Sequence, residues 1–472
     1  MRIFGDAAVE NCTDLALLTD LYQLTMAQSY FQSGRVEPAT FSLFVRDYPP
    51  NRGYFVAAGL KDVLDFLESF SFSGEAIDYL RSTEMFAADF LDYLQGLSFT
   101  GEVWAVSEGR LFFKDEPIVE ITAPLIEAQI AETFVINQIN LQSLIATKAA
   151  RCVHAAGGRT VVDFSLRRTH GIDAGIKVAR SSYLAGFAAS SNVLAGQKYG
   201  IPVVGTMAHS FVSSFEHEID AFRAFVKSFP DNSILLIDTY DTIAGAHKAV
   251  EVAREMAARG RKLRGVRIDS GDLAALAREV RKIFDDAELR DVKIIGSGGL
   301  DEYDLAEFAK ANVPYDSYGV GTRMGVSADA PWLDMAYKLV QQNGRPVLKL
   351  STGKAYWPGP KQIFRVVDAH RRLKKDVISL RAEKLPGAEP LLNKVMDSGK
   401  TQGTYPSLKV IRERFLEEFA LLDENVKTIH TPKTYPIELS LRLKQLNEEI
   451  SRQVTQVELE PATRVRHASG KN

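Results

Sequence analysis

The feature that most constrains the fold is a repeating pattern in the middle of the chain. From residue 159 onward, short runs rich in β-branched residues alternate with amphipathic stretches of helical periodicity. The runs predicted as strands are 159–165, 190–194, 202–210, 233–241, 263–272, 292–299 and 317–324. This spacing is expected of βα units that build a parallel sheet or barrel, and the polar residues after each strand favour a barrel.

The two ends of the chain have a different character. Residues 1–125 mix helical stretches with strand-like segments such as TFSLFVRDYPP and PIVEITAP. Further along, MAYKLVQQNGRPVLKLSTGK predicts a hairpin with NG at its turn, and TYPSLKVIRERFLEEFALLDENV predicts a helix. Neither end alone has the apolar segments of a core. We therefore expect 1–125 and 336–456 to form one α+β domain beside an α/β barrel at 126–335, with a flexible tail at 457–472.

The composition is that of a soluble globular protein, and its 472 residues suggest two or three domains. A net charge of -3 provides no basic surface and argues against nucleic acid as the main partner. Cys12 and Cys152 are too few for a disulfide framework or a metal cluster, and they fit a reducing cytosol. No segment approaches the roughly 18 uninterrupted apolar residues of a membrane helix. We expect a cytoplasmic protein without a membrane partner.

Two glycine-rich turns predict a phosphate site. IIGSGG lies between a predicted strand and a predicted helix, where backbone N–H groups can approach an anion. YGVGTRM provides a second glycine-rich turn of this kind one strand later. Barrels commonly hold a phosphate at the turns after their last strands. The alternative is a pair of tight turns that need positive φ angles. The candidate phosphate-binding residues are Gly296, Ser297, Gly298, Gly321 and Thr322.

Charged residues follow two other predicted strands. RIDSGDL places Arg267 and Asp269 on the same face of a strand. Arg267 supplies a cation, and Asp269 can accept ribose hydroxyls or hold a hydrated Mg²⁺. LIDTYD offers Asp238 at a corresponding strand end. Capping of the next helix is the alternative role for Asp272 or Ser270, and it leaves Arg267 unexplained. The same alternative applies to Asp238.

Two further motifs carry candidate groups. GTMAHSF places His209 among small residues, which leave the imidazole accessible for a nucleophilic or acid–base role. DFSLRR joins Phe164 to Arg167 and Arg168. An aromatic carboxylate could stack on the ring and bind the guanidinium groups. The alternatives are a packed or surface histidine, and a core phenylalanine beside solvated arginines.

Together these segments resemble the nicotinate phosphoribosyltransferase family. LLTDLYQLTMAQSY, FVRDYPPNRGYFVAAGL, EAQIAETFVINQINLQSLIATKAAR, SYLAGFAASSNVLAG and YPIELS extend the resemblance over nearly the whole chain. It implies a homodimer of two-domain subunits with an irregular α/β barrel of the type II phosphoribosyltransferase kind. The implied reaction forms nicotinate mononucleotide and pyrophosphate from nicotinate and phosphoribosyl pyrophosphate, in NAD biosynthesis by salvage. The resemblance also implies ATP as a co-substrate and Mg²⁺.

The resemblance assigns roles to residues as well. It implies that Tyr22 reaches the neighbouring subunit's site and stacks on the pyridine ring. It further implies that Thr206 and Arg267 contact nicotinate. Thr322 is expected to bind the phosphoribosyl group, and His209 is expected to be phosphorylated transiently by ATP.

Similarity to the related nicotinamide enzymes adds four assignments. Phe164 is expected to stack on the base and Arg167 to contact the substrate. Asp238 and Asp269 are expected to serve the ribose and Mg²⁺, although the sequence does not identify a set of metal ligands. Ser165 departs from the commoner Gly or Ala at its position, but it keeps a small side chain there.

Three other functions stay open. A nicotinamide phosphoribosyltransferase would favour an acidic partner for the amide, whereas the position before VLAG is Asn192, which favours nicotinate. A barrel that binds a phosphorylated metabolite without catalysis would not need His209, Asp238 and Arg267. A phosphate-anchored aldolase or isomerase usually needs a strand-end lysine or a glutamate pair, and no predicted barrel strand ends in lysine.

Overall fold

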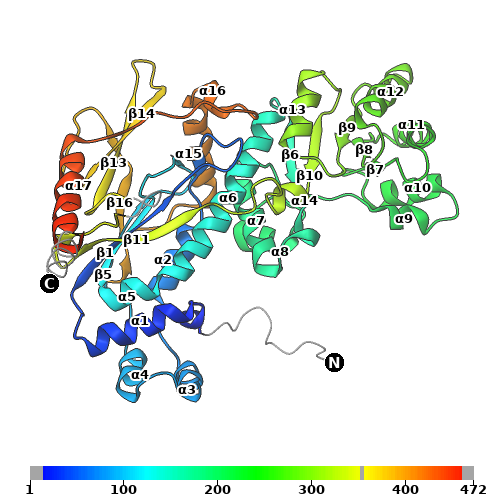
Figure 1. Cartoon of the computed structure of the whole chain (residues 1–472). Coiled ribbons are helices and arrows are strands. Elements are labelled where there is room, and N and C mark those ends of the chain that lie inside the picture. Colours follow the sequence, from blue (N-terminus) through cyan, green and yellow to red (C-terminus); the bar gives the residue numbers. More distant parts are fainter. Residues whose placement is uncertain (1–13, 351–355, 460–472) are drawn as a thin grey trace, which may run out of the picture.

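A long helix, α6 (Glu132–Ala155), joins the two parts of the molecule (Figure 1). The computed structural model describes residues 14–350 and 356–459 of the chain. On one side of α6 lies an antiparallel part built from both ends of the chain, and on the other lies a parallel sheet with its helices. Within the described residues, no helix is both long and apolar enough to cross a membrane.

The parallel sheet has the strand order β6-β10-β9-β8-β7. Its strands are β6 (Thr160–Asp163), β7 (Ile234–Leu236), β8 (Gly265–Ile268), β9 (Lys293–Gly296) and β10 (Ser317–Val320). All the ladders between them are parallel. Single bridges from Asp163 to Ser190 and from Ser190 to Val203 extend the sheet beyond β6. Five of the seven strands predicted from residue 159 onward are therefore confirmed as β6 to β10. The runs 190–194 and 202–210 are not strands, because each contributes a single bridged residue and their later residues begin α8 and α9.

Strand pairing does not close this sheet into a barrel. Among the described residues, β7 forms one edge, the bridge at Val203 forms the other, and no ladder joins the two edges. One side chain connects the sheet to the segment after this bridge, since Nη2 of Arg267 on β8 donates to the carbonyl oxygen of Met207 at 2.9 Å. The structure shows a mixed α/β fold with an open parallel sheet, and a closed barrel is not shown.

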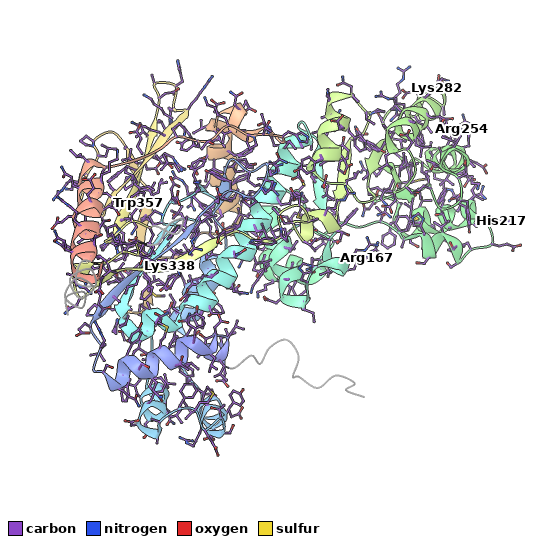
Figure 2. The ribbon with its side chains drawn as sticks, in the orientation of Figure 1. Arg167, His217, Arg254, Lys282, Lys338 and Trp357 are labelled. Carbon is purple, nitrogen blue, oxygen red and sulfur yellow. The ribbon has the colours of Figure 1, made fainter. Side chains whose placement is uncertain are left out.

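Helices follow the strands of the parallel sheet. They are α7 (Ile172–Leu184), α8 (Val193–Tyr199), α9 (His209–Ser213), α10 (Glu218–Ser228), α11 (Thr242–Ala257), α12 (Leu273–Asp286), α13 (Glu302–Lys310) and α14 (Thr322–Gly325). Figure 2 shows Arg254 of α11 and Lys282 of α12 on the outside of this part. The opposite face of α12 buries Val280 and Phe284, as expected of an amphipathic helix over a sheet. Asp272 caps α12 by accepting a hydrogen bond from Ala275 N, so its capping role is confirmed.

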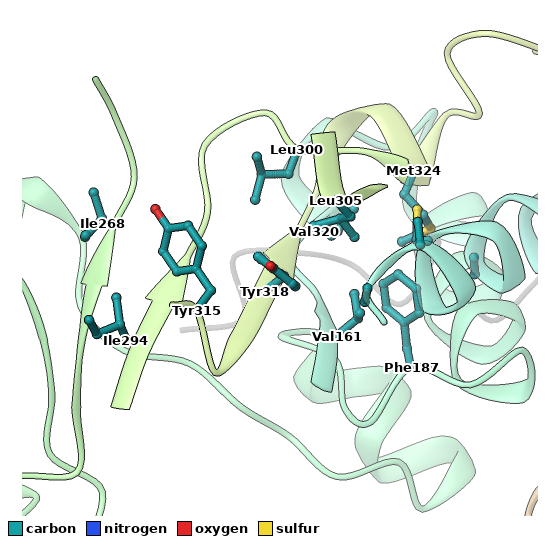
Figure 3. Packing of buried hydrophobic residues seen from close by; sticks show 14 of the residues in the cluster. Val161, Phe187, Ile268, Ile294, Leu300, Leu305, Tyr315, Tyr318, Val320 and Met324 are labelled. Carbon is teal, nitrogen blue, oxygen red and sulfur yellow. The ribbon is translucent and has the colours of Figure 1, made fainter. Parts of the chain in front are cut away.

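Apolar side chains pack between the sheet and its helices (Figure 3). Tyr315 and Tyr318 lie at the centre, with ring centroids 5.5 Å apart. The hydroxyl group of Tyr315 donates to the carbonyl oxygen of Leu273 and so connects the core to the start of α12. Burying side chains of this size stabilises the fold by roughly 1.5–3 kcal/mol each.

The antiparallel part contains a sheet with strands from both ends of the chain, in the order β12-β11-β1-β5-β3-β16-β17. Its strands are β1 (Pro38–Val45), β3 (Glu102–Val106), β5 (Val119–Pro124), β11 (Met335–Gln342), β12 (Arg345–Pro346), β16 (Leu392–Asp397) and β17 (Lys400–Thr401). Asn343 and Gly344 both have positive φ angles between β11 and β12, which confirms the predicted NG hairpin. The domain limits at 125 and 335 stay predictions.

The remaining elements surround this sheet. The strands are β2 (Phe55–Val56), β4 (Leu111–Phe112), β13 (Lys361–Val367), β14 (Leu373–Leu380), β15 (Glu389–Pro390) and β18 (Ile437–Leu439). The helices are α1 (Leu21–Gln32), α2 (Leu60–Glu68), α3 (Gly74–Ser82), α4 (Ala88–Gln95), α5 (Leu125–Ile130), α15 (Leu408–Leu421), α16 (Glu424–Lys427) and α17 (Leu441–Val454). Helix α15 confirms the helix predicted near the C-terminus. Cys12 and residues 460–472, most of the expected tail, lie outside the described residues.

Buried charges fix α6 against the parallel sheet. Nζ of Lys148 on α6 lies 2.5 Å from Glu302 and 2.7 Å from Asp329, and its side chain is fully buried. Arg151, one turn later, donates to Glu302 at 3.0 Å. Arg52 contributes a third cation and pairs with Asp329 at 3.0 Å. Opposite charges therefore neutralise one another inside the molecule, as buried ionic groups require.

We expect Lys148→Met to lower the free energy of unfolding by about 3–5 kcal/mol, because it removes the buried cation that the carboxylates of Glu302 and Asp329 share. Urea unfolding followed by circular dichroism measures the change. Lys282→Met is the control, since the Lys282–Asp286 pair is exposed and its loss should not move the midpoint. A Lys148→Met protein as stable as the unmutated chain would contradict the prediction.

Candidate active site

The carboxyl ends of the parallel strands border a cleft of about 510 Å³. In open α/β sheets, ligands commonly bind at this edge. The lining comes from residues 164–168 after β6, from 205–209, from Arg267 and Asp269 at β8, and from glycine-rich residues after β9 and within β10 and α14. The fold thus brings together most of the site residues predicted from the sequence.

Close packing of two strand ends builds the first glycine-rich turn. Gly298 has a φ of 101°, and a Cβ atom there would lie only 1.9 Å from the carbonyl oxygen of Asp269. Ser297 donates through its hydroxyl group to Oδ1 of Asp269 at 2.5 Å. Glycine is therefore required at 298, because a side chain would push this turn away from the end of β8.

Two expectations about this turn need correction. Gly296 does not line the cleft: it ends β9, where a Cβ atom would lie 2.9 Å from the ring of Tyr315. The N-terminus of α13 does not follow the turn directly either. Asp301 caps that helix by accepting a hydrogen bond from Tyr303 N, so a carboxylate already occupies the positive end of the helix. Ser297, Gly298 and Gly299 form the part of the motif that faces the cleft.

The second turn adds a hydroxyl group to the cleft. Gly321 and Thr322 line it at the start of α14. Nη1 of Arg168 donates to Oγ1 of Thr322 at 3.3 Å, which links the segment after β6 to the one after β10. The DFSLRR motif suggested both Arg167 and Arg168 as candidate cations, and both line the cleft.

Three guanidinium groups make the cleft cationic. Arg167, Arg168 and Arg267 line it together with a single carboxylate, that of Asp269. In the view of Figure 2, Arg167 lies between α8 and the group of helices α9 to α12. An anionic ligand would therefore be attracted here.

Arg267 and Phe164 form one wall. The guanidinium carbon of Arg267 lies 5.8 Å from the centroid of the Phe164 ring. Burial lowers the pKa of Arg267, and the carboxylates of Asp269 and Asp238 oppose that shift. Its Nε is buried and has no hydrogen-bond partner among the described residues. Because Arg267 lines the cleft, a ligand carboxylate could accept a charge-assisted bond from its guanidinium group.

Gly319 allows the phenylalanine ring to adopt this position. A Cβ atom on Gly319 would lie 2.4 Å from Cδ2 of Phe164. The ring therefore packs directly over the backbone of β10, with one side left to the cleft. This contact does not support the alternative in which Phe164 is only a core residue.

His209 is accessible and oriented. It is the first residue of α9, and 44% of its side chain is exposed. Nδ1 lies 3.2 Å from the hydroxyl group of Thr239, and Nε2 lies 3.9 Å from Oδ2 of Asp269. The alternative of a packed core histidine is wrong. Thr239 was missed in the sequence, although it directly follows Asp238 in LIDTYD.

Asp238 does not line the cleft. Its Oδ2 accepts hydrogen bonds from Asp269 N at 3.0 Å and from the Ser270 hydroxyl group at 2.6 Å. Asp241, three residues later, caps the next helix instead. Asp238 therefore holds the turn that carries Asp269. Within the described part of the chain, no three acidic, histidine or cysteine side chains form a group that could hold a metal ion.

The argument from Asn192 is wrong. This side chain is buried, its Oδ1 accepts from Ala195 N at 3.0 Å, and its Nδ2 donates to the carbonyl oxygen of Gly175 at 3.1 Å. Both functions of the amide are used in capping α8 and fixing it to α7. The preceding residue, Ser191, lines the cleft instead and was not identified from the sequence. Asn192 cannot distinguish a carboxylate from an amide.

Tyr22 lies apart from the cleft of its own chain. It is the second residue of α1, half of it is exposed, and it borders a separate pocket of about 380 Å³ with Glu132 and Pro331. Thr206, in contrast, lines the cleft beside Met207.

Three family profiles match the chain. They are described as the nicotinate phosphoribosyltransferase N-terminal domain at 17–140, the nicotinate phosphoribosyltransferase family at 160–355, and the C-terminal domain at 386–447.

Named relatives agree with these profiles. The chain is 45% identical to a nicotinate phosphoribosyltransferase of Mycobacterium tuberculosis over 91% of this chain and 92% of that protein. It is 37% identical to the nicotinate phosphoribosyltransferase of Bacillus subtilis over 90% and 93% of the two chains. The crystal structure of human nicotinic acid phosphoribosyltransferase superimposes with a TM-score of 0.83 at 30% identity, over 92% of this chain and 99% of the human one. The chain belongs to the nicotinate phosphoribosyltransferase family.

Proposed function

We propose that the chain forms nicotinate mononucleotide and pyrophosphate from nicotinate and phosphoribosyl pyrophosphate. One observation carries this proposal: a single cleft holds an aromatic ring with a buried guanidinium group on one wall and two glycine-rich turns on another. The first wall suits a flat aromatic carboxylate, and the turns suit a phosphate. Family membership supports the same reaction.

The chemistry needs positioning more than proton transfer. The pyridine nitrogen attacks the anomeric carbon with its own lone pair, and the bond from that carbon to the pyrophosphate oxygen breaks through an oxocarbenium-like transition state. Phe164 and Arg267 would hold the ring, while Gly298 and Thr322 would hold the phosphate of the ribose. Holding both reactants in line supplies the main rate gain. The carboxylate of Asp269 would stabilise the positive charge that develops on the ribose.

Mg²⁺ would neutralise charge on the departing pyrophosphate. Asp269 is the cleft carboxylate that fits this role, because its Oδ2 faces the cleft near His209 while Oδ1 is held by Ser297. A single carboxylate suits an ion whose other ligands are substrate oxygens and water. Asp238 would act through its bonds to residues 269 and 270.

ATP would act through His209. A ring nitrogen of this residue would attack the γ-phosphorus of ATP, ADP would leave, and water would later release the phosphate from the histidine. The exposed imidazole at the cleft supports this role. The displacement at the ribose does not need the phosphohistidine, so the coupling would instead shift affinities and the overall equilibrium.

Two further proposals concern the quaternary structure and the parallel sheet. A homodimer would let Tyr22 of one subunit stack on the base in the other, which is supported by the exposed apolar residues Leu18, Leu21 and Tyr22 beside one another. We also propose that the parallel sheet forms an irregular barrel that stays open between Val203 and β7.

The first prediction about the reaction concerns substrate choice. Nicotinate should exceed nicotinamide by about 100-fold in kcat/KM, because the amide lacks the charge-assisted contact to Arg267. Arg267→Gln should remove most of this preference by lowering kcat/KM for nicotinate alone. Product analysis with nicotinate, nicotinamide and quinolinate in parallel measures both effects. Comparable turnover of nicotinate and nicotinamide by the unmutated protein would refute the carboxylate argument, and no turnover would favour a non-catalytic binding protein.

The second prediction concerns His209. His209→Asn should abolish nicotinate-stimulated ATP hydrolysis and acid-labile labelling from γ-labelled ATP, while some ATP-independent mononucleotide synthesis remains. His217→Asn is the matched control, because His217 is exposed just before α10 and lies at the far side of this part (Figure 2). If the His209→Asn protein still hydrolyses ATP in step with product, His209 does not carry the phosphate.

The third prediction concerns the two subunits. Tyr22→Ala and Arg267→Ala proteins should each be nearly inactive. A mixed dimer of the two should regain about half of the unmutated activity, because one of its two sites then has both residues. Co-expression with two affinity tags isolates this heterodimer. Verified heterodimers without activity would place Tyr22 outside the partner's site.

A further inference from the structure

Arg323 connects the second glycine-rich turn to the helix that follows the first. It comes directly after Thr322 but does not line the cleft. Its Nη1 lies 3.2 Å from Oδ2 of Asp304 and 3.7 Å from Oδ2 of Asp301. These two aspartates form the capping box at the start of α13, in which Asp304 accepts a hydrogen bond from Asp301 N at 3.0 Å.

The start of α13 is itself anchored. Asp301 is buried, and Nζ of Lys148 lies 4.0 Å from its Oδ2. The next residue, Glu302, contacts Lys148 at 2.5 Å and Arg151 at 3.0 Å. Gly299 of the first turn lies only two residues before Asp301 in the chain. Any displacement of Asp301 would therefore be passed to the turn.

The two turns lack a backbone ladder where they face the cleft. The pairing of β9 with β10 runs from Ile295↔Ser317 to Gly296↔Tyr318, and beyond it β10 continues beside β6 up to Val320. The distance between Ser297–Gly299 and Gly321–Thr322 therefore depends on contacts other than the sheet.

We propose that Arg323 and the Asp301–Asp304 capping box form a positioning clamp that fixes the spacing of the two phosphate-binding turns. The clamp does not touch the ligand, and the identity of that ligand rests on the proposed function. Two turns from different strands can bind one phosphate group well only if their separation is constant, since small misplacements weaken contacts of defined geometry. Arg323 is 51% exposed, so its loss should affect binding more than folding.

A direct contact from Arg323 to the phosphate is the competing explanation. The two explanations predict opposite changes in phosphate affinity when the acidic partner of Arg323 is removed. If Arg323 bound the phosphate itself, removing the acidic partner would free the guanidinium group and strengthen binding or leave it unchanged. If Arg323 acts as a clamp, removing either partner weakens binding. Asp304→Asn separates the two explanations, because asparagine keeps a side-chain oxygen for the capping box but loses the charge.

The test measures the Kd for ribose 5-phosphate by calorimetry and the KM for phosphoribosyl pyrophosphate. Arg323→Met and Asp304→Asn should each raise this Kd and this KM by about three- to fivefold. The double variant should raise them no further than either single variant does. Arg323→Lys should restore part of the loss. The kcat and the KM for nicotinate should stay unchanged. Arg261→Met is the matched control: Arg261 is 52% exposed and pairs with Asp231 at 2.6 Å, and the two residues precede β8 and β7, at the ends of these strands opposite the cleft.

Several outcomes would overturn the clamp. Tighter or unchanged binding in Asp304→Asn, together with weaker binding in Arg323→Met, would make Arg323 a direct ligand. Additive losses in the double variant, or no change in any variant, would also reject the clamp. If the unmutated protein binds ribose 5-phosphate but does not turn over nicotinate, the proposed function is refuted, while the Kd values of the variants for ribose 5-phosphate still test the clamp. Unmutated protein that does not bind ribose 5-phosphate would reject the clamp itself.

Discussion

The contact between Lys148 and Glu302 is the interaction on which the rest of the structure depends. This contact lies inside the molecule, where each charge needs a partner. It joins α6 to the start of α13. Arg52, from the antiparallel part, reaches the same cluster through Asp329. The two parts of the protein therefore meet at a point that permits little sliding, because any shift would leave a buried charge unpaired.

This rigidity matters because the first glycine-rich turn of the cleft leads along the chain into the cluster. The first glycine-rich turn precedes Glu302 by a few residues, so the anchored helix start also sets the position of Ser297 and Gly298. Elsewhere in the cleft, Arg267 lies over the ring of Phe164 and donates to the carbonyl oxygen of Met207. A reaction that depends on holding two anions and a flat ring in line benefits from walls that do not move.

Local patterns predicted the repeating units and many site residues. β-branched runs, glycine turns and capping aspartates act over a few residues, so the strands from β6 to β10 and residues such as Arg267, Asp269, His209 and Thr322 could be identified from the sequence. Errors arose where one residue type has two uses. Gly296 and Gly298 belong to one motif, yet the former makes room for Tyr315 and the latter for the end of β8. Asn192 and Asp238 are polar residues near strand ends, but both are used in support of other segments.

The sequence by itself determined the α/β character of the chain, its family resemblance and the set of polar groups available for chemistry, because these depend on residue type and short-range spacing. The tertiary structure alone decided which of these groups share a cleft, since that depends on contacts across long stretches of chain. It also left the parallel sheet unclosed by strand pairing, with Arg267 of β8 bonded to the carbonyl oxygen of Met207. Thr239 beside His209 and Arg323 beside Asp304 have no signature in the sequence, because each pair is formed only when separate strands and helices pack together.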